Sequence, residues 1–515
     1  MVDASWIGLV PLLPALSAGW IGIALLGGWQ QGERGERVTA RVALWGVGLA
    51  LGLLLLLDLD ALLLARTPGS IALFPWMDTV GYRVMVSFIL DPLGLALSTL
   101  AALLCWLTVR FAVCYLHREA AFQRFFASLS LFASGLLLFL LAGNAVLAFV
   151  GWELMGLTSY LLIGYANERS QATGNATRVL LTNRIGDAGF LAGILFSYVW
   201  LGGGEWGDIA GGFALLSSLQ LGILAGGFVL AALVKSAQFP FAAWVGRALE
   251  GPTPSSAAFY GALMIHAGVF LLLRLQDLIA QSPFLMVVLC LLGLLTVLYG
   301  LLVGLVQTDV KSGLIAAGQT QVGWMFLACG LGWFDWAAWH LAAHAGWRLY
   351  QVLNAPSYMH LLPGPTRPVW VALHRRQGLY AAAIARFWLD PLTDVLITRP
   401  TQNLARDLQS LDDNLVNRLL GNGAMERILF GQLHASRPTE KPGHRQVQGV
   451  GLFGALLEAL ANRLQWLEQL VLRMGGEGSV RSVAQLGDYL LRIDRLFSEP
   501  RYLVLMILIT FVVAL

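Results

Sequence analysis

Long apolar stretches alternate with short polar segments up to about residue 361. Each stretch comes close to the roughly twenty apolar residues that an α-helix needs to cross a bilayer. The pattern predicts about eleven such helices, so the expected fold class is an all-α polytopic membrane protein. Their approximate ranges are 5–28, 42–65, 85–109, 125–143, 145–165, 177–202, 214–245, 255–275, 284–306, 312–331 and 335–361.

One of these stretches, 214–245, is too long for a regular single span and contains Lys235 followed by Pro240. A proline inside a helix removes a backbone hydrogen bond, so a break here leaves carbonyls that need water or polar side chains. Broken helices are typical of membrane proteins that handle ions. A kinked helix with a purely structural role is the alternative.

The pattern changes after the last of these stretches. Two segments place charges and leucines at helical spacing, which predicts amphipathic helices that lie on a membrane surface or on a partner. A linker rich in polar residues and proline separates them, and an apolar segment that is short for a crossing ends the chain as a possible anchor. These segments read LDPLTDVLITRPTQNLARDLQSLDDNLVNRLL, LLEALANRLQWLEQLVLRM, HASRPTEKPGHRQ and YLVLMILITFVVAL.

Composition supports the membrane assignment. Of the 515 residues, 57% are hydrophobic and 12% charged, whereas soluble domains have roughly 25% charged residues. The net charge of +3 is too small to indicate a nucleic-acid partner. The four cysteines lack the spacing of metal ligands and are expected to be small buried side chains. They are Cys105, Cys114, Cys290 and Cys329.

Arginines gather in alternate loops, which predicts the orientation. The first, third and fifth loops are basic, whereas the sixth carries Glu205 and Asp208. Because basic loops remain in the cytoplasm, the N-terminus is expected outside and the region after the last span in the cytoplasm. The first apolar stretch has no basic segment before it, so we expect a retained span and not a signal peptide. The loop arginines are Arg34, Arg37, Arg41, Arg110, Arg118, Arg124, Arg169 and Arg178.

Ionisable side chains recur inside the apolar stretches, where a charge is costly and is usually kept for function. The clearest is Glu153 in FVGWELMGLTSYLLIGYA. A position in the lipid headgroups would explain Glu153 alone, but a series on successive helices favours a proton path. The other members are Arg184, Asp187, Lys235, His266, Lys311, His340, His344 and Arg348.

Glu153 and Lys235 are opposite ionisable groups at membrane depth. Two such groups that can approach and separate are able to move a proton, because each changes the proton affinity of the other. We therefore expect Glu153 inside the bundle and within reach of Lys235. Histidines have the intermediate proton affinity that relay steps need. His340, His344 and Arg348 follow i, i+4, i+8 spacing and share one helix face.

Several members of the series have simpler alternatives. Arg184 and Asp187 are spaced as a structural ion pair, and Asp309 with Lys311 suits a helix start at the membrane interface. The paired histidines suggest a metal site, but no nearby carboxylate or cysteine completes it and Arg348 would repel a cation. No metal is therefore expected.

Five motifs make the sequence recognisable. The chain resembles, over roughly 85–360, the antiporter-like membrane subunits of respiratory complex I and of Mrp-type cation/proton antiporters. The motifs are GWELMGLTSYLLIGY, LTNRIGDAGF, LVKSAQFPFAAW with EGPTPSSA, LVQTDVKSGLIAAGQTQVGWMF and HLAAHAGWR. The resemblance implies a fold of two inverted repeats of five helices, each with a broken helix.

The resemblance also implies roles. The family's glutamate–lysine pair that drives proton movement falls on Glu153 and Lys235, and its central relay on Lys311, His340 and His344. The sequence departs from the family pattern in three places. Arg348 replaces a lysine and cannot release a proton, Tyr260 replaces a histidine with His266 further along, and the second repeat stops early.

The expected domains follow from these boundaries. They are N-terminal transmembrane helices at 1–120, a first antiporter-like repeat at 121–280, a partial second repeat at 281–361, an amphipathic cytoplasmic-side extension at 362–500 and a terminal anchor at 501–515.

This arrangement resembles the short membrane subunit of DAB-type inorganic carbon uptake complexes. That resemblance implies a bacterial cytoplasmic membrane protein whose proton or cation flow energises CO2 hydration to bicarbonate. The partner would be a large cytosolic zinc-containing subunit similar to carbonic anhydrase. One alternative is a proton-pumping subunit of a complex I-type NADH:quinone oxidoreductase or related membrane hydrogenase, surrounded by other membrane subunits and lipid. Another is a scaffold that has lost transport. In each case the chain has neither a catalytic site nor a cofactor of its own.

Overall fold

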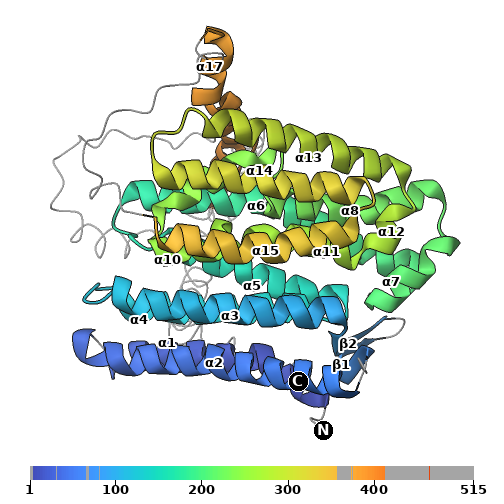
Figure 1. Cartoon of the computed structure of the whole chain (residues 1–515), viewed down its shortest axis with the longest axis horizontal. Coiled ribbons are helices and arrows are strands. Elements are labelled where there is room, and N and C mark those ends of the chain that lie inside the picture. Colours follow the sequence, from blue (N-terminus) through green and yellow to red (C-terminus); the bar gives the residue numbers. More distant parts are fainter. Residues whose placement is uncertain are drawn as a thin grey trace, which may run out of the picture. The chain divides into compact units, whose positions relative to one another are not determined.

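The computed structural model describes residues 4–29, 32–64, 69–79, 82–355, 373, 375–411 and 463. The chain divides into two compact units, Met1–Thr393 and Asp394–Leu515. In the first unit long helices pack side by side, with α1 and α2 next to α3 and α4, and α13 and α14 on the far side of the bundle (Figure 1).

These helices occupy the places where apolar stretches predict spans. Nine helical stretches within the described residues are long and apolar enough to cross a membrane. The polytopic helical fold is thus confirmed. The nine include the segmented stretch Thr253–Arg274, whereas the more polar helices α14 and α15 are not among them. The long helices are α1 (Leu9–Leu26), α2 (Gly32–Leu64), α3 (Pro92–Tyr115), α4 (Phe122–Leu141), α5 (Ala145–Ile163), α6 (Ser170–Leu201), α8 (Ser218–Lys235), α13 (Pro283–Gly304), α14 (Val310–Gly330) and α15 (Phe334–Leu353).

The helix predicted over 85–109 is wrong at its start. Residues 82–90 instead form strand β2 (Tyr82–Leu90), which pairs antiparallel with β1 (Gly69–Thr79). The segment YRVMVSFIL is rich in β-branched and aromatic residues, which suit a strand. Helix α3 begins only at Pro92, because Asp91 is extended and its side chain caps the helix by accepting a hydrogen bond from the Gly94 amide.

The overlong stretch 214–245 is broken, as expected. Helix α8 ends at Lys235, and the helical path resumes with η3 (Phe241–Ala243) after Pro240. Short pieces follow up to residue 280. They are α9 (Trp244–Arg247), η4 (Ala248–Glu250), α10 (Thr253–Ser256), the π-helical η5 (Ala257–Ala262), η6 (Met264–His266), α11 (Ala267–Arg274) and α12 (Gln276–Ala280).

The remaining elements are short. In the first unit they are η1 (Ala4–Gly8), α7 (Trp206–Gly212), η2 (Phe213–Leu215), α17 (Gln377–Ile384), η8 (Arg386–Trp388) and α18 (Leu389–Thr393). The described part of the second unit consists of η9 (Asp394–Thr398), α19 (Arg399–Leu411) and residue 463. The predicted linker, most of the second amphipathic segment and the terminal anchor lie outside the described residues.

Candidate functional site

A row of four charged side chains crosses the contact between α5, α6 and α8. Glu153 lies on α5, Arg184 and Asp187 lie on α6, and Lys235 is the last residue of α8. The Arg184 guanidinium donates from Nη1 to Glu153 Oε2 at 2.6 Å, and its Nη2 lies 2.8 Å from Asp187 Oδ2. Lys235 Nζ lies 4.0 Å from Asp187 Oδ1. Charges therefore alternate in sign along the row.

The expected direct pair between Glu153 and Lys235 is not what the structure shows. Among the described residues the partner of Glu153 is Arg184, and the nearest carboxylate to Lys235 is Asp187. The planar guanidinium explains this arrangement, because its several donors can serve two carboxylates at once. The ion pair Arg184–Asp187 is present, but as the middle of a longer row and not as an isolated pair.

The two halves of the row differ in burial. The side chains of Arg184 and Glu153 are 41% and 29% exposed, whereas those of Asp187 and Lys235 are 4% and 1% exposed. Glu153 is thus half-buried, contrary to the expectation of a fully interior carboxylate. Its second oxygen, Oε1, is nevertheless shielded and has no hydrogen-bond partner among the described residues. The outer end of the row therefore has a free acceptor, and its inner end is sealed in protein.

Trp152 holds the inner end in place. Its indole Nε1 donates to Asp187 Oδ1 at 2.7 Å, and its carbonyl accepts from Lys235 Nζ at 3.4 Å. The ammonium also lies 4.6 Å from the centre of the indole ring, within the range of a cation–π contact. A buried charge is tolerated when it is paired and hydrogen-bonded in this way.

Gly156, one helical turn after Glu153, provides the space for the two cations. A Cβ atom at Gly156 would lie 3.3 Å from Arg184 Nη2 and 3.5 Å from Lys235 Nζ. Sequence reasoning missed both Gly156 and Trp152, although they stand in the same GWELMG motif as Glu153.

Polar side chains from α13 and α14 satisfy the backbone at the break after Lys235. The Phe239 amide donates to Thr296 Oγ1 at 2.9 Å, and Gln319 Nε2 donates to the Ala242 carbonyl at 2.7 Å. Trp244 Nε1 donates to the Val234 carbonyl at 2.9 Å. These contacts meet the need of a non-helical backbone at membrane depth for partners.

A second group joins α15 to the short pieces before α11. His266 Nε2 and His344 Nδ1 are 2.9 Å apart, and His266 Nδ1 is 2.9 Å from the Ala262 carbonyl, which belongs to the π-helical turn. Arg348 reaches His344 Nε2 from Nη2 at 3.3 Å. Together these residues form one hydrogen-bonded row.

The groups at the two ends of this row determine which tautomers neutral His266 and His344 adopt. A carbonyl oxygen only accepts, so His266 Nδ1 carries its hydrogen and Nε2 accepts from His344 Nδ1. His344 Nε2 is then the acceptor for Arg348. All donors point from Arg348 toward Ala262. Neither end of the row can pass on a proton in this arrangement, because arginine does not release one and the carbonyl does not take one.

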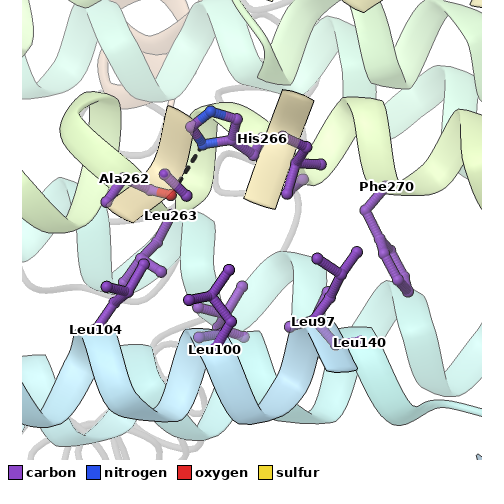
Figure 2. A pocket seen from close by; sticks show the side chains of 13 residues that line it. Leu97, Leu100, Leu104, Leu140, Ala262, Leu263, His266 and Phe270 are labelled. Carbon is purple, nitrogen blue, oxygen red and sulfur yellow. Dashed lines mark hydrogen bonds between the residues drawn. The ribbon is translucent and has the colours of Figure 1, made fainter. Parts of the chain in front are cut away.

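Among the described residues, the hydrogen-bond partners of His266 are the Ala262 carbonyl and His344. The small cavity beside His266 is lined by aliphatic side chains of α3, α4 and α15 and by Phe270 (Figure 2). Figure 2 shows the imidazole with its Nδ1 turned to the Ala262 carbonyl.

The other expected relay residues lie apart from this row. His340 Nε2 is 2.9 Å from Gln321 Oε1, and its ring centre is 6.0 Å from that of His344. Lys311 donates to Thr253 Oγ1 at 2.7 Å, while Asp309 caps the start of α14 by accepting from the Ser312 amide. Asp309 and Lys311 thus lie at the start of α14; their place at the membrane interface stays a prediction. Within the described ranges no group of three or more histidine, cysteine, aspartate or glutamate side chains is arranged to hold a metal ion.

A polar cluster that sequence reasoning did not find lies at the loop before α7. Glu205 accepts hydrogen bonds from Ser87 Oγ at 2.8 and 3.0 Å and from Asn144 Nδ2 at 3.2 Å. Burial raises the pKa of the Glu205 carboxyl, and the hydrogen bonds from Ser87 and Asn144 oppose that effect. The cluster ties β2 and the start of α5 to the loop that carries Glu205.

Comparison with known families identifies two matching regions. Residues 142–360 match the family described as NADH:quinone oxidoreductase/Mrp antiporter, TM, and residues 76–126 match the family described as NADH-Ubiquinone oxidoreductase (complex I), chain 5 N-terminus. The charged row and the histidine row both fall within the first of these regions.

Individual relatives are similar over about two thirds of the chain. The chloroplastic NAD(P)H-quinone oxidoreductase subunit 5 of Chaetosphaeridium globosum is 33% identical over 366 residues, which is 70% of this chain and 54% of the relative. For NADH-ubiquinone oxidoreductase chain 5 of Allomyces macrogynus the identity is 33%, with coverage of 68% and 54%. For NAD(P)H-quinone oxidoreductase chain 5 of Synechocystis sp. it is 32%, with coverage of 69% and 53%. The chain spans about half the length of these relatives.

A solved structure shows the same fold. In the Mrp complex from Dietzia sp. DQ12-45-1b, one chain superposes with a TM-score of 0.58 and 20% sequence identity. The match covers 98% of this chain and 63% of the other.

Proposed function

Because the chain belongs to the family of antiporter-like membrane subunits of the complex I and Mrp type, we propose that it translocates protons across a membrane as one subunit of a larger complex. The observation that carries the proposal is the row Glu153–Arg184–Asp187–Lys235. Placing two carboxylates and two cations within apolar helices, with Asp187 and Lys235 almost fully buried, costs free energy that an apolar contact between the same helices would not. A transport role accounts for that cost.

In the proposed step Arg184 acts as a switch between two carboxylates. When its guanidinium turns toward Glu153, Asp187 is left to Lys235 and stabilises the ammonium form. When the guanidinium turns back to Asp187, it repels the ammonium, and Lys235 releases its proton toward the relay of Lys311 and His340. The neutral amine then takes the proton that Glu153 has accepted, which returns Glu153 to its carboxylate form. Arg184 keeps its own protons throughout, because arginine is not a proton carrier. Glu153, with its unpaired oxygen at the more exposed end, is the group that takes a proton from outside the row.

In this scheme the histidine row is a barrier to proton transfer. With Arg348 at one end and the Ala262 carbonyl at the other, protons do not cross from His344 to His266 and onward. Lys311 and His340 lie outside that row and remain the proposed relay toward the rest of the complex.

The relatives favour one type of complex. Those at about one third identity are named as subunits of NADH- or NAD(P)H-quinone oxidoreductases. We therefore place first a proton-translocating subunit of a quinone oxidoreductase of the complex I type, in which other subunits carry out the redox chemistry. This order reverses the one that the sequence resemblance suggested.

The second candidate function is that of the membrane subunit of an inorganic carbon uptake complex. The family match stops at residue 360, although the chain continues to residue 515. Residues after the match would then dock a large cytosolic zinc-containing subunit similar to carbonic anhydrase. In both cases we propose a bacterial cytoplasmic membrane with the N-terminus outside.

Proton flux into vesicles tests the proposed function. The full chain, purified with whatever subunits accompany it, is reconstituted into liposomes that contain a pH-sensitive dye, and a potassium gradient with valinomycin supplies the potential. We expect acidification that exceeds that of empty liposomes. The absence of flux from both the isolated chain and the purified complex would refute proton translocation.

The proteins that accompany the chain decide between the two candidates. Further membrane subunits of an oxidoreductase support the first, and a large zinc-containing subunit supports the second. A chain truncated after residue 365 should still insert but lose the zinc subunit, since insertion follows hydrophobicity and arginine bias. If the truncated chain keeps that subunit, the docking role of the extension is wrong.

A further inference from the structure

The turn Arg386–Trp388, between α17 and α18, has an unusual backbone. All three residues are non-glycine and have positive φ, of 50° at Arg386, 54° at Phe387 and 53° at Trp388. This left-handed conformation is unfavourable for residues with a side chain, and it persists only where the surroundings enforce it. The contacts of this turn therefore indicate what it is for.

Its apolar contacts are with the segment that follows the break at Lys235. Leu389, directly after the turn, is 4% exposed and belongs to the same cluster as Ala242 and Ala243 of η3. The Phe387 ring lies 6.0 Å from that of Tyr299 on α13, which also belongs to this cluster. The turn is thus packed against the piece of chain through which the helical path resumes.

Its polar contacts reach the same segment. Arg247, the last residue of α9, binds both oxygens of Asp390, with Nε 3.2 Å from Oδ1 and Nη2 3.2 Å from Oδ2. This two-pronged geometry is the strong form of an arginine–carboxylate pair. Arg386 lies directly on Gly246, where a Cβ atom would be only 2.3 Å from Nη1. Any larger side chain at position 246 would push the turn away.

We propose that Asp390 is a positioning residue for transport, and that the clamp formed by residues 386–390 holds the segment 236–247 that follows the break at Lys235. The transport part of this inference rests on the proposed function. The clamp lies beyond the family match, which ends at residue 360, so it is a feature of the non-matching part of the chain. Through the clamp, residues after the family match contact the broken segment that follows Lys235 directly.

Hydrogen exchange of peptides covering 236–250, measured by mass spectrometry on the full chain in nanodiscs, tests the clamp. We expect Asp390→Asn to speed exchange there about fivefold, because it removes the partly exposed ion pair with Arg247 and the longer one, of 3.9 Å, with Arg386. Gly246→Ala should have a similar effect, because it displaces Arg386 without altering the pair. Asp390→Glu keeps the negative charge that faces both Arg247 and Arg386, so it should leave exchange near the wild-type rate.

The matched control is Asp78→Asn, which removes the exposed ion pair with Arg83 in the hairpin. It should leave exchange in 236–250 unchanged. The clamp is disproved if Asp390→Asn leaves this exchange at the wild-type rate, or if exchange rises equally in all helices, which indicates general destabilisation. Unchanged proton flux in Asp390→Asn with faster exchange would disprove the positioning role. Hydrogen exchange is measured without any transport assay. The clamp can therefore be tested even if the proposed transport function is wrong.

Discussion

Replacing Asp187 by asparagine is the most direct perturbation of the charged row. The carboxylate is the only acidic group in contact with Lys235 among the described residues, and both side chains are almost fully buried. At their separation of 4.0 Å the attraction of two unit charges is about 4 kcal/mol for an effective dielectric constant of 20. Breaking a buried pair from one side costs about 3–5 kcal/mol in practice, which agrees with this value.

We therefore expect Asp187→Asn to lower proton flux at least tenfold, because the ammonium of Lys235 loses its partner. We also expect it to lower the unfolding temperature in detergent. Both are measured on the same preparation, by vesicle acidification and by thermal unfolding. Asp187→Glu keeps the charge and is the conservative control.

The double variant Asp187→Asn with Lys235→Met separates stability from transport. Removing both members of a buried pair leaves no unpaired charge, so stability should recover while flux stays low. Wild-type flux in Asp187→Asn would refute the reasoning, because the row would then be unnecessary for transport. A double variant as unstable as Asp187→Asn would refute the assigned pairing of Asp187 with Lys235.

Three further substitutions test other parts of the scheme by the same flux assay. Glu153→Gln should abolish flux with expression and assembly intact. Glu33→Gln, at an exposed ion pair, is the control. Normal flux in Glu153→Gln would contradict a role for Glu153 as proton acceptor. Arg348→Met should raise proton leak without the partner complex, whereas Arg348→Lys should keep leak low. If Arg348→Met abolishes flux without any leak and Arg348→Lys transports normally, Arg348 is a required charge in the path and not a barrier to protons. Gly156→Ala should slow flux severalfold by crowding Arg184 and Lys235, and should cost less than about 1–2 kcal/mol of stability. An unchanged rate of proton flux would show that the two cations do not need that space.

Some features of the fold follow from local sequence alone. The number and order of the long helices come from hydrophobic length, because a bilayer imposes it on every span. The break after Lys235 comes from Pro240, whose missing amide cannot complete a helix. The hairpin was missed because YRVMVSFIL is mostly apolar, with only Arg83 and Ser87 polar, and a short apolar run does not distinguish a strand from the start of a helix.

The sequence by itself determined which residues carry charge at membrane depth, since that requires only their types and the length of the apolar stretch around them. Which of them pair was decided by the tertiary structure. Glu153 contacts Arg184 instead of Lys235, and His266 meets His344 across 78 positions of the chain. Spacing along one helix defines the face on which a side chain lies. It does not define which face of a neighbouring helix it meets, because that depends on how all side chains between the helices pack together. The clamp of Asp390 on Arg247 arises in the same way, between segments that no local pattern connects.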